Sequence, residues 1–274
     1  MEARHVLNAK NGRVELPTGG MDYIRFGRGE RTLVMLPGVG DGLKTVRGAA
    51  LPFALLYRRL ARDFTVYVFS RRETLTPGMT TRDMADDLNA AMDVLKLNGA
   101  AVVGVSQGGM IAQWLAIDHP ERVSKLVLTV TLARPNPTVQ AYIHEMLELA
   151  RRGDYRGILV RTAELSYSPK RLAQARRLNR LIGSFGKPKS FERFIIQAES
   201  CLTHDTYDEL QHIACPTLVL GGTDDHIVSG QASIEIAKRV PHCQLYMYEG
   251  LGHGLYEEAK DFIERVATFS RDIN

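Results

Sequence analysis

The amino-acid sequence predicts an α/β protein: a mostly parallel sheet flanked by helices, with a helical segment inserted into it. The first observation is a series of short, continuous apolar runs bounded by glycine, proline or charge, which is typical of strands buried on both faces. The second is that these runs alternate with stretches in which apolar residues recur at helical spacing. The third is a single interruption, at residues 133–212, that contains no strand-like run.

The strands are expected in two groups. Residues 13–16 and 23–26 fit an antiparallel hairpin at an edge of the sheet, because Pro17 and Gly19-Gly20 lie between them. The parallel strands are predicted at residues 32–36, 64–69, 100–105, 125–130, 217–220 and 244–248. Helices are predicted between and after them, at residues 51–62, 81–97, 108–119, 231–240 and 256–269.

The interruption is predicted to be a helical cap, 133–212, inserted in a core formed by residues 1–132 and 213–274. Its helices are expected at residues 139–152, 155–165, 170–182 and 191–201. From Arg151 to Arg193 the cap holds 12 Lys or Arg residues against 3 Asp or Glu residues. We interpret this charge as solvated helix faces; the alternative is that it meets an anionic substrate, partner or surface.

Composition excludes several classes of protein. The net charge of +4 over 274 residues is too small to indicate a nucleic-acid partner. No apolar stretch approaches the ~18–20 residues of a membrane helix, and the first residues lack the apolar segment of a secretory signal. Three cysteines are too few for a disulfide framework. We therefore expect a cytoplasmic monomer or homodimer that acts on a small molecule, with no membrane partner.

The sequence Gly104-Val105-Ser106-Gln107-Gly108 carries the strongest chemical signal. It lies directly between a predicted strand and a predicted helix, the context in which Gly-x-Ser-x-Gly forms a nucleophile elbow. The glycines are needed because side chains two residues before and after the serine would collide in so tight a turn. The following helix directs free N–H groups at the reacting centre. Ser106 is therefore the candidate nucleophile.

A serine nucleophile needs a base, and the base needs an orienting carboxylate. His253 is the candidate base, because it follows the last predicted strand and has glycine on both sides. The carboxylate is expected just after the strand at 217–220, where Asp224 and Asp225 both qualify. We prefer Asp225 and expect the other aspartate to make turn hydrogen bonds.

An acyl-transfer site also needs donors for the oxyanion. The backbone N–H of Gln107 is one candidate, and that of Val39, in the glycine-rich loop at 37–42, is the other. This loop also resembles a phosphate-binding loop, but Leu43 separates Gly42 from Lys44, whereas that motif has glycine directly before the lysine.

Cysteine and histidine residues with metal-ligand spacing occur once, at Cys201, His204, His212 and Cys215. Because Cys215 leads directly into a buried strand, we interpret these cysteines as small apolar residues. We expect neither a metal site nor a cofactor.

Together these motifs resemble the α/β-hydrolase superfamily, over residues 22–269. The elbow, the sequence around Asp225 and the Gly252-His253-Gly254 loop are each similar to the superfamily's patterns, and the resemblance implies Asp225 as the acid. The sequence departs from the superfamily in having Pro37 where histidine is common. It also departs at Ser70-Arg71-Arg72-Glu73, which implies a buried arginine or an altered entrance. The serine nucleophile argues against haloalkane dehalogenases and epoxide hydrolases, which use aspartate.

The resemblance implies an esterase-like serine hydrolase that cleaves a small carboxylic ester, thioester or lactone through an acyl-enzyme. The catalytic residues expected are Ser106, Asp225 and His253, with Val39 and Gln107 as the oxyanion donors. A C–C bond hydrolase with the same three residues is the first alternative. A small-molecule receptor without turnover is the second.

Overall fold

The computed structural model describes residues 7–174 and 186–271 and is built on an eight-stranded sheet with the order β1-β2-β4-β3-β5-β6-β7-β8. β1 pairs antiparallel with β2, and β2 with β4, whereas the remaining pairs are parallel. The strands are β1 (Lys10–Leu16), β2 (Gly19–Phe26), β3 (Arg31–Leu36), β4 (Phe64–Arg72), β5 (Ala100–Val105), β6 (Val123–Thr129), β7 (Thr217–Gly222) and β8 (Cys243–Tyr248). The predicted mostly parallel sheet and its edge hairpin are confirmed.

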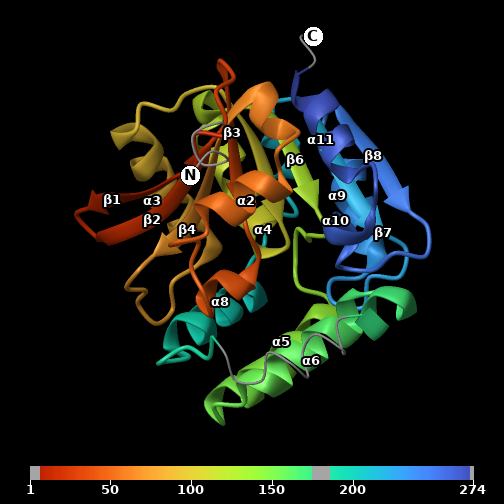
Figure 1. Ribbon diagram of the computed structural model, residues 1–274. Helices are drawn as coiled ribbons and strands as arrows, with labels where there is room; N and C mark the ends of the chain where they lie inside the picture. The colour runs from red at the N-terminus through yellow and green to blue at the C-terminus, as the bar shows by residue number, and fades with distance from the viewer. Residues whose placement is uncertain (1–6, 175–185, 272–274) are drawn as a thin grey trace.

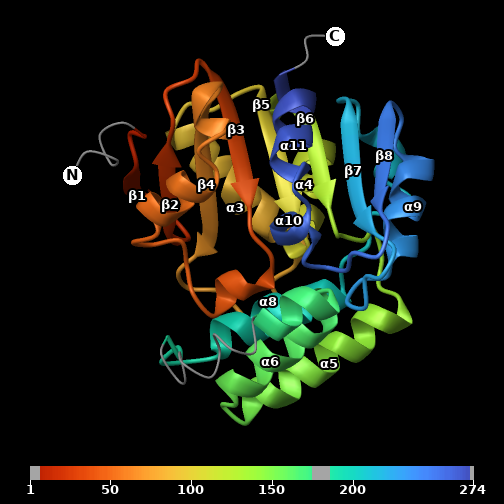
Figure 2. The ribbon, with the colours of Figure 1, turned by 45° about the vertical axis from the view of Figure 1, so that its right-hand side comes forward.

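Helices cover both faces of the sheet (Figures 1 and 2). One apolar core joins the sheet to α3 (Thr81–Val94), α4 (Gln107–Asp118) and α9 (Gly230–Arg239). The other joins it to α2 (Ala50–Leu56) and α11 (Phe262–Arg271). These strands are apolar on both faces because each face is buried under a helical layer.

The segment between β6 and β7, called the insert below, consists of helices and loops in its described residues. It contains α5 (Pro137–Arg151), α6 (Tyr155–Ser166) and α8 (Glu192–Leu202), and residues 169–174 are also helical. The rest of the helix predicted at 170–182 lies outside the described residues. Figure 2 shows the insert below the sheet, at the edge toward which the parallel strands point. Its apolar side packs on the start of α4 and on Ile227 and Val228.

Two predicted helices are divided in the structure. Residues 256–269 form α10 (Leu255–Glu258) and α11, because the backbone of Ala259 is extended between them. The Glu258 carboxylate accepts hydrogen bonds from the backbone and hydroxyl of Ser168, which ties α10 to the insert. Residues 51–62 form α2 and a separate turn, η2 (Leu60–Arg62). Apolar periodicity continues across both breaks, so it does not reveal them.

The residues with metal-ligand spacing make other contacts. His204 is buried, with its two ring nitrogens 2.8 Å from Thr81 Oγ1 and 3.3 Å from Thr206 Oγ1, whereas His212 is exposed beside Glu209. No group of three or more His, Cys, Asp or Glu side chains within residues 7–174 and 186–271 is arranged to hold a metal ion. A helix long and apolar enough to cross a membrane is likewise absent from this part of the chain.

The buried His204 predicts a loss of stability in mild acid. Burial lowers the pKa of His204 to about 3, from a usual value of 6.5. Between those values the unfolded chain binds a proton at this site and the folded chain does not, so the free energy of unfolding falls as the pH falls. We expect urea unfolding to show that the free energy of unfolding falls from pH 7.5 to pH 5 by more in the wild type than in His204→Gln. The difference between the two decreases should be up to about 2 kcal/mol. Identical losses in the two proteins would contradict this account.

Candidate active site

Ser106 stands on the turn that joins β5 to α4. Its backbone has φ 54° and ψ −122°, in the region that L-residues rarely adopt. A Cβ on Gly104 would lie 2.5 Å from Gly108 O, and one on Gly108 would lie 2.1 Å from Leu36 O. Both positions therefore require glycine, and the strand–turn–helix arrangement expected for a nucleophile elbow is present.

His253 is held by a buried carboxylate. Its Nδ1 lies 2.9 Å from Asp225 Oδ2, and both side chains are buried. Asp225 Oδ1 accepts hydrogen bonds from the backbone N–H groups of Ile227 (2.8 Å) and Val228 (2.9 Å). Burial raises the pKa of the Asp225 carboxyl, but the His253 ring and these two N–H groups outweigh burial and hold that pKa below its usual value. The carboxylate therefore stays ionised and fixes the orientation of the ring.

The neighbouring aspartate has a different environment. Asp224 is exposed, and its carboxylate accepts a 3.1 Å hydrogen bond from the Thr223 hydroxyl. Its backbone N–H donates to Leu251 O over 3.0 Å, which joins the loop after β7 to the loop that carries His253. Asp225 is thus the aspartate that the structure brings to His253, and Asp224 belongs to the turn.

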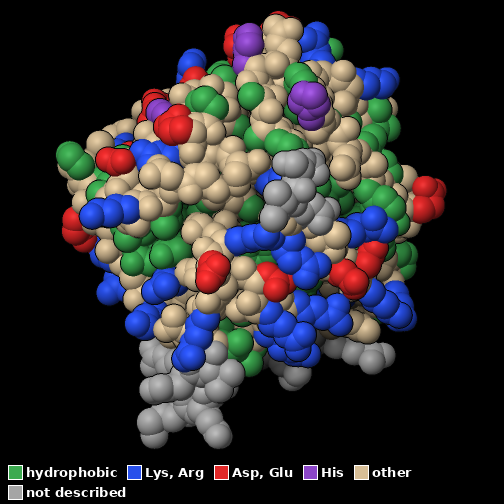
Figure 3. Space-filling view, turned by 90° about the horizontal axis from the view of Figure 1, so that it is seen from above, with side chains coloured by type: hydrophobic (Ala, Val, Ile, Leu, Met, Phe, Trp, Pro, Cys, Tyr) green, Lys and Arg blue, Asp and Glu red, His purple; other side chains and the backbone are tan. Residues whose placement is uncertain are grey.

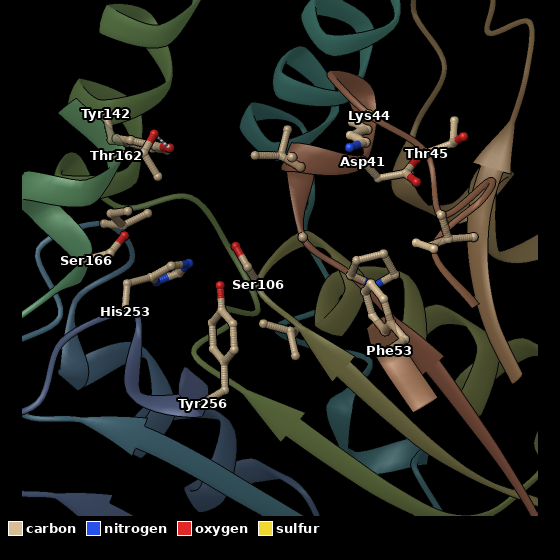
Figure 4. Close-up of a pocket in the computed structure, with 18 residues that line it drawn as sticks. Asp41, Lys44, Thr45, Phe53, Ser106, Tyr142, Thr162, Ser166, His253 and Tyr256 are labelled. Atoms are coloured by element: carbon tan, nitrogen blue, oxygen red, sulfur yellow. Dashed lines mark hydrogen bonds between the residues drawn. The ribbon is translucent and has the colours of Figure 1, made fainter. Parts of the chain in front are cut away.

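Ser106 and His253 line one cavity of about 430 Å³ between the sheet edge and the insert. Figure 4 shows the Ser106 hydroxyl, the His253 ring and the Tyr256 hydroxyl pointing toward a common space. Burial raises the pKa of Tyr256 well above its usual value, so its hydroxyl stays protonated and can donate a hydrogen bond there. The insert contributes Tyr142, Thr162 and Ser166 to the wall.

The two expected oxyanion donors occupy equivalent positions. Val39 is the first residue of η1 (Val39–Gly42), and Gln107 is the first residue of α4. An N–H at the first position of a helical turn has no intrahelical acceptor, so both groups can bind an anion. The loop approaches the nucleophile closely, since a Cβ on Gly38 would lie 3.2 Å from Ser106 Cβ.

Of the two possibilities that the Ser70–Glu73 sequence left open, the structure contains the buried arginine. Arg71 is fully enclosed at the end of β4, and burial lowers the pKa of its guanidinium to about 10 despite the neighbouring Asp41. Its Nη2 donates to Pro37 O (2.6 Å) and to Gln107 Oε1 (3.1 Å). Arg71 therefore contacts both segments that supply the oxyanion donors.

Most basic residues of the insert do not face the cavity. Five described ones are paired with carboxylates: Arg134 with Glu235, Arg151 with Glu199, Arg161 with Glu145, Arg171 with Glu257 and Arg193 with Asp41. The described Lys and Arg residues without such a pair are exposed, which agrees with solvated helix faces. Lys and Arg side chains also occur outside the insert. Figure 3 shows several of them, mixed with Asp and Glu side chains, on the face of the molecule opposite the insert.

Sequence reasoning did not find Tyr256 or the residues that the insert supplies. Tyr256 had a usable signal, because it follows His253 by three residues and lies in the short helix α10 beside the base loop. Tyr142 and Thr162, whose hydroxyls lie 3.0 Å apart, had none. Which side of an inserted helix faces the core depends on how the insert docks, and helical spacing alone does not determine that.

This sheet order, with a serine elbow after β5 and helices on both faces, defines an α/β hydrolase. The family described as "alpha/beta hydrolase fold" matches residues 31–260. The chain belongs to this family and is a hydrolase.

Two curated relatives carry the names of hydrolases. The putative carbamate hydrolase RutD of Caulobacter sp. (strain K31) is 29% identical over 246 residues, covering 82% of this chain and 84% of the relative. The 3-oxoadipate enol-lactonase 2 of Acinetobacter baylyi is 24% identical over 191 residues, covering 70% and 71%. The crystal structure of the enol-lactonase from Burkholderia xenovorans LB400 has a TM-score of 0.80 at 20% identity, covering 95% of this chain and all of that one. This last similarity supports the fold alone.

The contrast between the two aspartates yields a test. Asp225→Asn should lower kcat for an ester by about 10²–10⁴-fold, because only this carboxylate orients the His253 ring and stabilises the imidazolium. Asp224→Asn is the matched control and should retain wild-type kcat within about twofold, since surface substitutions of this kind have small effects. Steady-state kinetics of the three proteins decide the matter. A larger loss for Asp224→Asn would assign the acid to that residue instead.

Proposed function

We propose that the protein hydrolyses a small carboxylic ester, thioester or lactone through an acyl-enzyme formed on Ser106. The observation that carries the proposal is the buried Asp225–His253 pair, which lines the same cavity as a serine on a strained elbow. The relatives named as an enol-lactonase and a putative carbamate hydrolase support the reaction class, because both names describe hydrolysis at a carbonyl group.

The proposed acylation proceeds in two steps, formation of a tetrahedral intermediate and its collapse to the acyl-enzyme. Ser106 Oγ attacks the substrate carbonyl carbon while His253 Nε2 accepts the hydroxyl proton, and the carbonyl oxygen becomes an oxyanion held by the Val39 and Gln107 N–H groups. Asp225 stabilises the imidazolium through the Nδ1 proton without accepting it. The C–O or C–S bond of the intermediate then breaks, and the leaving oxygen or sulfur takes the proton from His253. In a lactone the hydroxyl formed in this way stays attached to the acyl group.

Deacylation repeats these steps with water. Water loses a proton to His253 as its oxygen attacks the acyl carbon, and the same two N–H groups hold the second oxyanion. Collapse of this intermediate releases the carboxylic acid and returns the proton to Ser106. The protonated hydroxyl of Tyr256 faces the same space and is placed to donate to an oxygen of the substrate.

The size of the cavity supports a small substrate. A second cavity of about 380 Å³ shares Val39, Tyr142, Thr162 and Tyr256 with the first and extends under α6, where Ile158 and Leu159 line it. The extension is apolar apart from the paired Arg171 and Glu257. We propose that it receives the hydrocarbon part of the acyl group, whose burial against its apolar side chains is favourable.

The test is turnover of short-chain p-nitrophenyl esters by the wild type and Ser106→Ala. We expect the wild type to be active and Ser106→Ala to lose several orders of magnitude in kcat, because the nucleophile is absent. Equal melting temperatures establish that both proteins are folded. Ser106→Ala activity above about a tenth of wild type would remove Ser106 from the role of nucleophile.

A substrate panel then separates the alternatives. Simple esters and lactones are turned over if the proposal is correct, and a vinylogous diketo acid is turned over instead if the protein is a C–C bond hydrolase. A folded wild type that turns over none of these compounds would contradict the proposal.

A further inference from the structure

The loop that carries Val39 is bound to the insert through one buried carboxylate. Asp41 lies in η1, two residues after Val39, and its side chain is completely inaccessible to solvent. Its Oδ2 accepts hydrogen bonds from Arg193 Nη2 (2.5 Å), from the Arg71 backbone N–H (3.1 Å) and from Gln197 Nε2 (3.3 Å). Because Arg193 and Gln197 both belong to α8, helix α8 is bonded directly to this loop.

Arg193 joins three segments of the chain at once. Besides the Asp41 carboxylate, its guanidinium donates to the backbone oxygens of Asp41, Arg71 (2.9 Å) and Arg72 (3.2 Å). The backbones also touch at this point, since a Cβ on Gly42 would lie 2.5 Å from Phe194 Cα. Helix α8, the end of β4 and η1 are therefore held in one fixed arrangement.

A second set of bonds connects the same helix to the elbow. Gln107 Nε2 donates to Gln197 O (2.6 Å) and to Ser200 Oγ (3.0 Å) on α8, and its Oε1 accepts from Arg71. Arg71 also donates to Pro37 O, at the start of the loop. The two segments that supply the oxyanion donors, the loop and the elbow, are thus bridged by Arg71 on one side and by α8 on the other.

The buried cluster of Asp41, Arg71 and Arg193 contains features that lower the stability of the fold. Arg71 Nε, Arg71 Nη1 and Asp41 Oδ1 are buried and have no hydrogen-bond partner among the described residues. Buried ion pairs are frequently no more stabilising than apolar side chains of the same size, and unsatisfied polar atoms add a cost. These costs indicate that the cluster serves to arrange the site rather than to stabilise the fold.

We propose that Arg193 and Asp41 are positioning residues through which helix α8 of the insert sets the geometry of the oxyanion hole. The inference rests on the proposed function and adds a role for the insert in it. Docked α8 holds Asp41, Asp41 holds η1, and η1 presents the Val39 N–H beside the elbow. Because the oxyanion exists only in the transition state and the intermediates, this arrangement acts on kcat and leaves substrate binding unchanged.

The experiment compares Arg193→Gln, Arg193→Lys and Asp41→Asn with a matched control, Arg151→Gln. Arg151 also anchors α8, through an exposed pair with Glu199 at 3.2 Å, but it contacts neither Asp41 nor the elbow. Each protein is titrated with a fluorophosphonate to count reactive sites. The kcat per reactive site and the KM are then measured for a p-nitrophenyl ester.

We expect Arg193→Gln and Asp41→Asn to lower kcat per site by roughly 10–100-fold, a substantial part of the effect of losing one oxyanion donor, with KM within about twofold of wild type. Arg193→Lys should recover part of this loss, because its ammonium reaches Asp41 but cannot make the other three bonds. The double variant Arg193→Gln/Asp41→Asn should lose less than the product of the two single losses, since the two side chains share one contact. The control Arg151→Gln should match the wild type.

Three results would overturn the inference. One is a loss of reactive sites with unchanged kcat per site, which would make the cluster merely structural. The second is a rise in KM alone, which would assign it to substrate binding, and the third is an equal loss of kcat in Arg151→Gln. A wild type that neither turns over esters nor reacts with the fluorophosphonate would instead reject the proposed function, and this inference with it.

Discussion

Ser106 holds its backbone at φ 54°, a conformation that costs a non-glycine residue roughly 1–3 kcal/mol and persists only where the surroundings enforce it. Here the end of β5 and the start of α4 enforce it, because Gly104 and Gly108 let backbone atoms meet where any side chain would collide. Leu36 O lies directly against Gly108, so the end of β3 is part of the same contact. The elbow therefore fixes where the loop that carries Val39 begins, and the remainder of the site is arranged around the elbow.

The parallel sheet brings the other groups to this point. Loops that follow β3, β5, β7 and β8 all leave the same edge, which is where parallel α/β sheets bind their ligands. This places the buried Asp225 and His253 beside Ser106 although 119 and 147 positions separate them from it in the sequence. The insert covers that edge from below and completes the cavity with side chains of its own (Figure 2).

The sequence was most informative where the determinants are local. Continuous apolar runs identified every parallel strand, and Gly-x-Ser-x-Gly between strand and helix located the elbow, because both signals depend on neighbouring residues. The sequence around Asp225 and His253 likewise pointed to two residues that the structure joins by a hydrogen bond. The contact of Arg193 with Asp41 spans 152 positions and depends on how the insert docks, so no local pattern encodes it. The break at Ala259 was missed for a related reason, since a contact of Glu258 with Ser168 anchors the short α10.

A crystal structure of the adduct with a phosphonate ester tests the central claim most directly, because the tetrahedral phosphorus imitates the intermediate that the site is proposed to stabilise. The account predicts a bond from phosphorus to Ser106 Oγ and a phosphonyl oxygen about 2.7–3.1 Å from the backbone nitrogens of both Val39 and Gln107. His253 should remain bonded to Asp225 and face the leaving-group side. An adduct on another residue, or a phosphonyl oxygen directed away from these two N–H groups, would contradict the account.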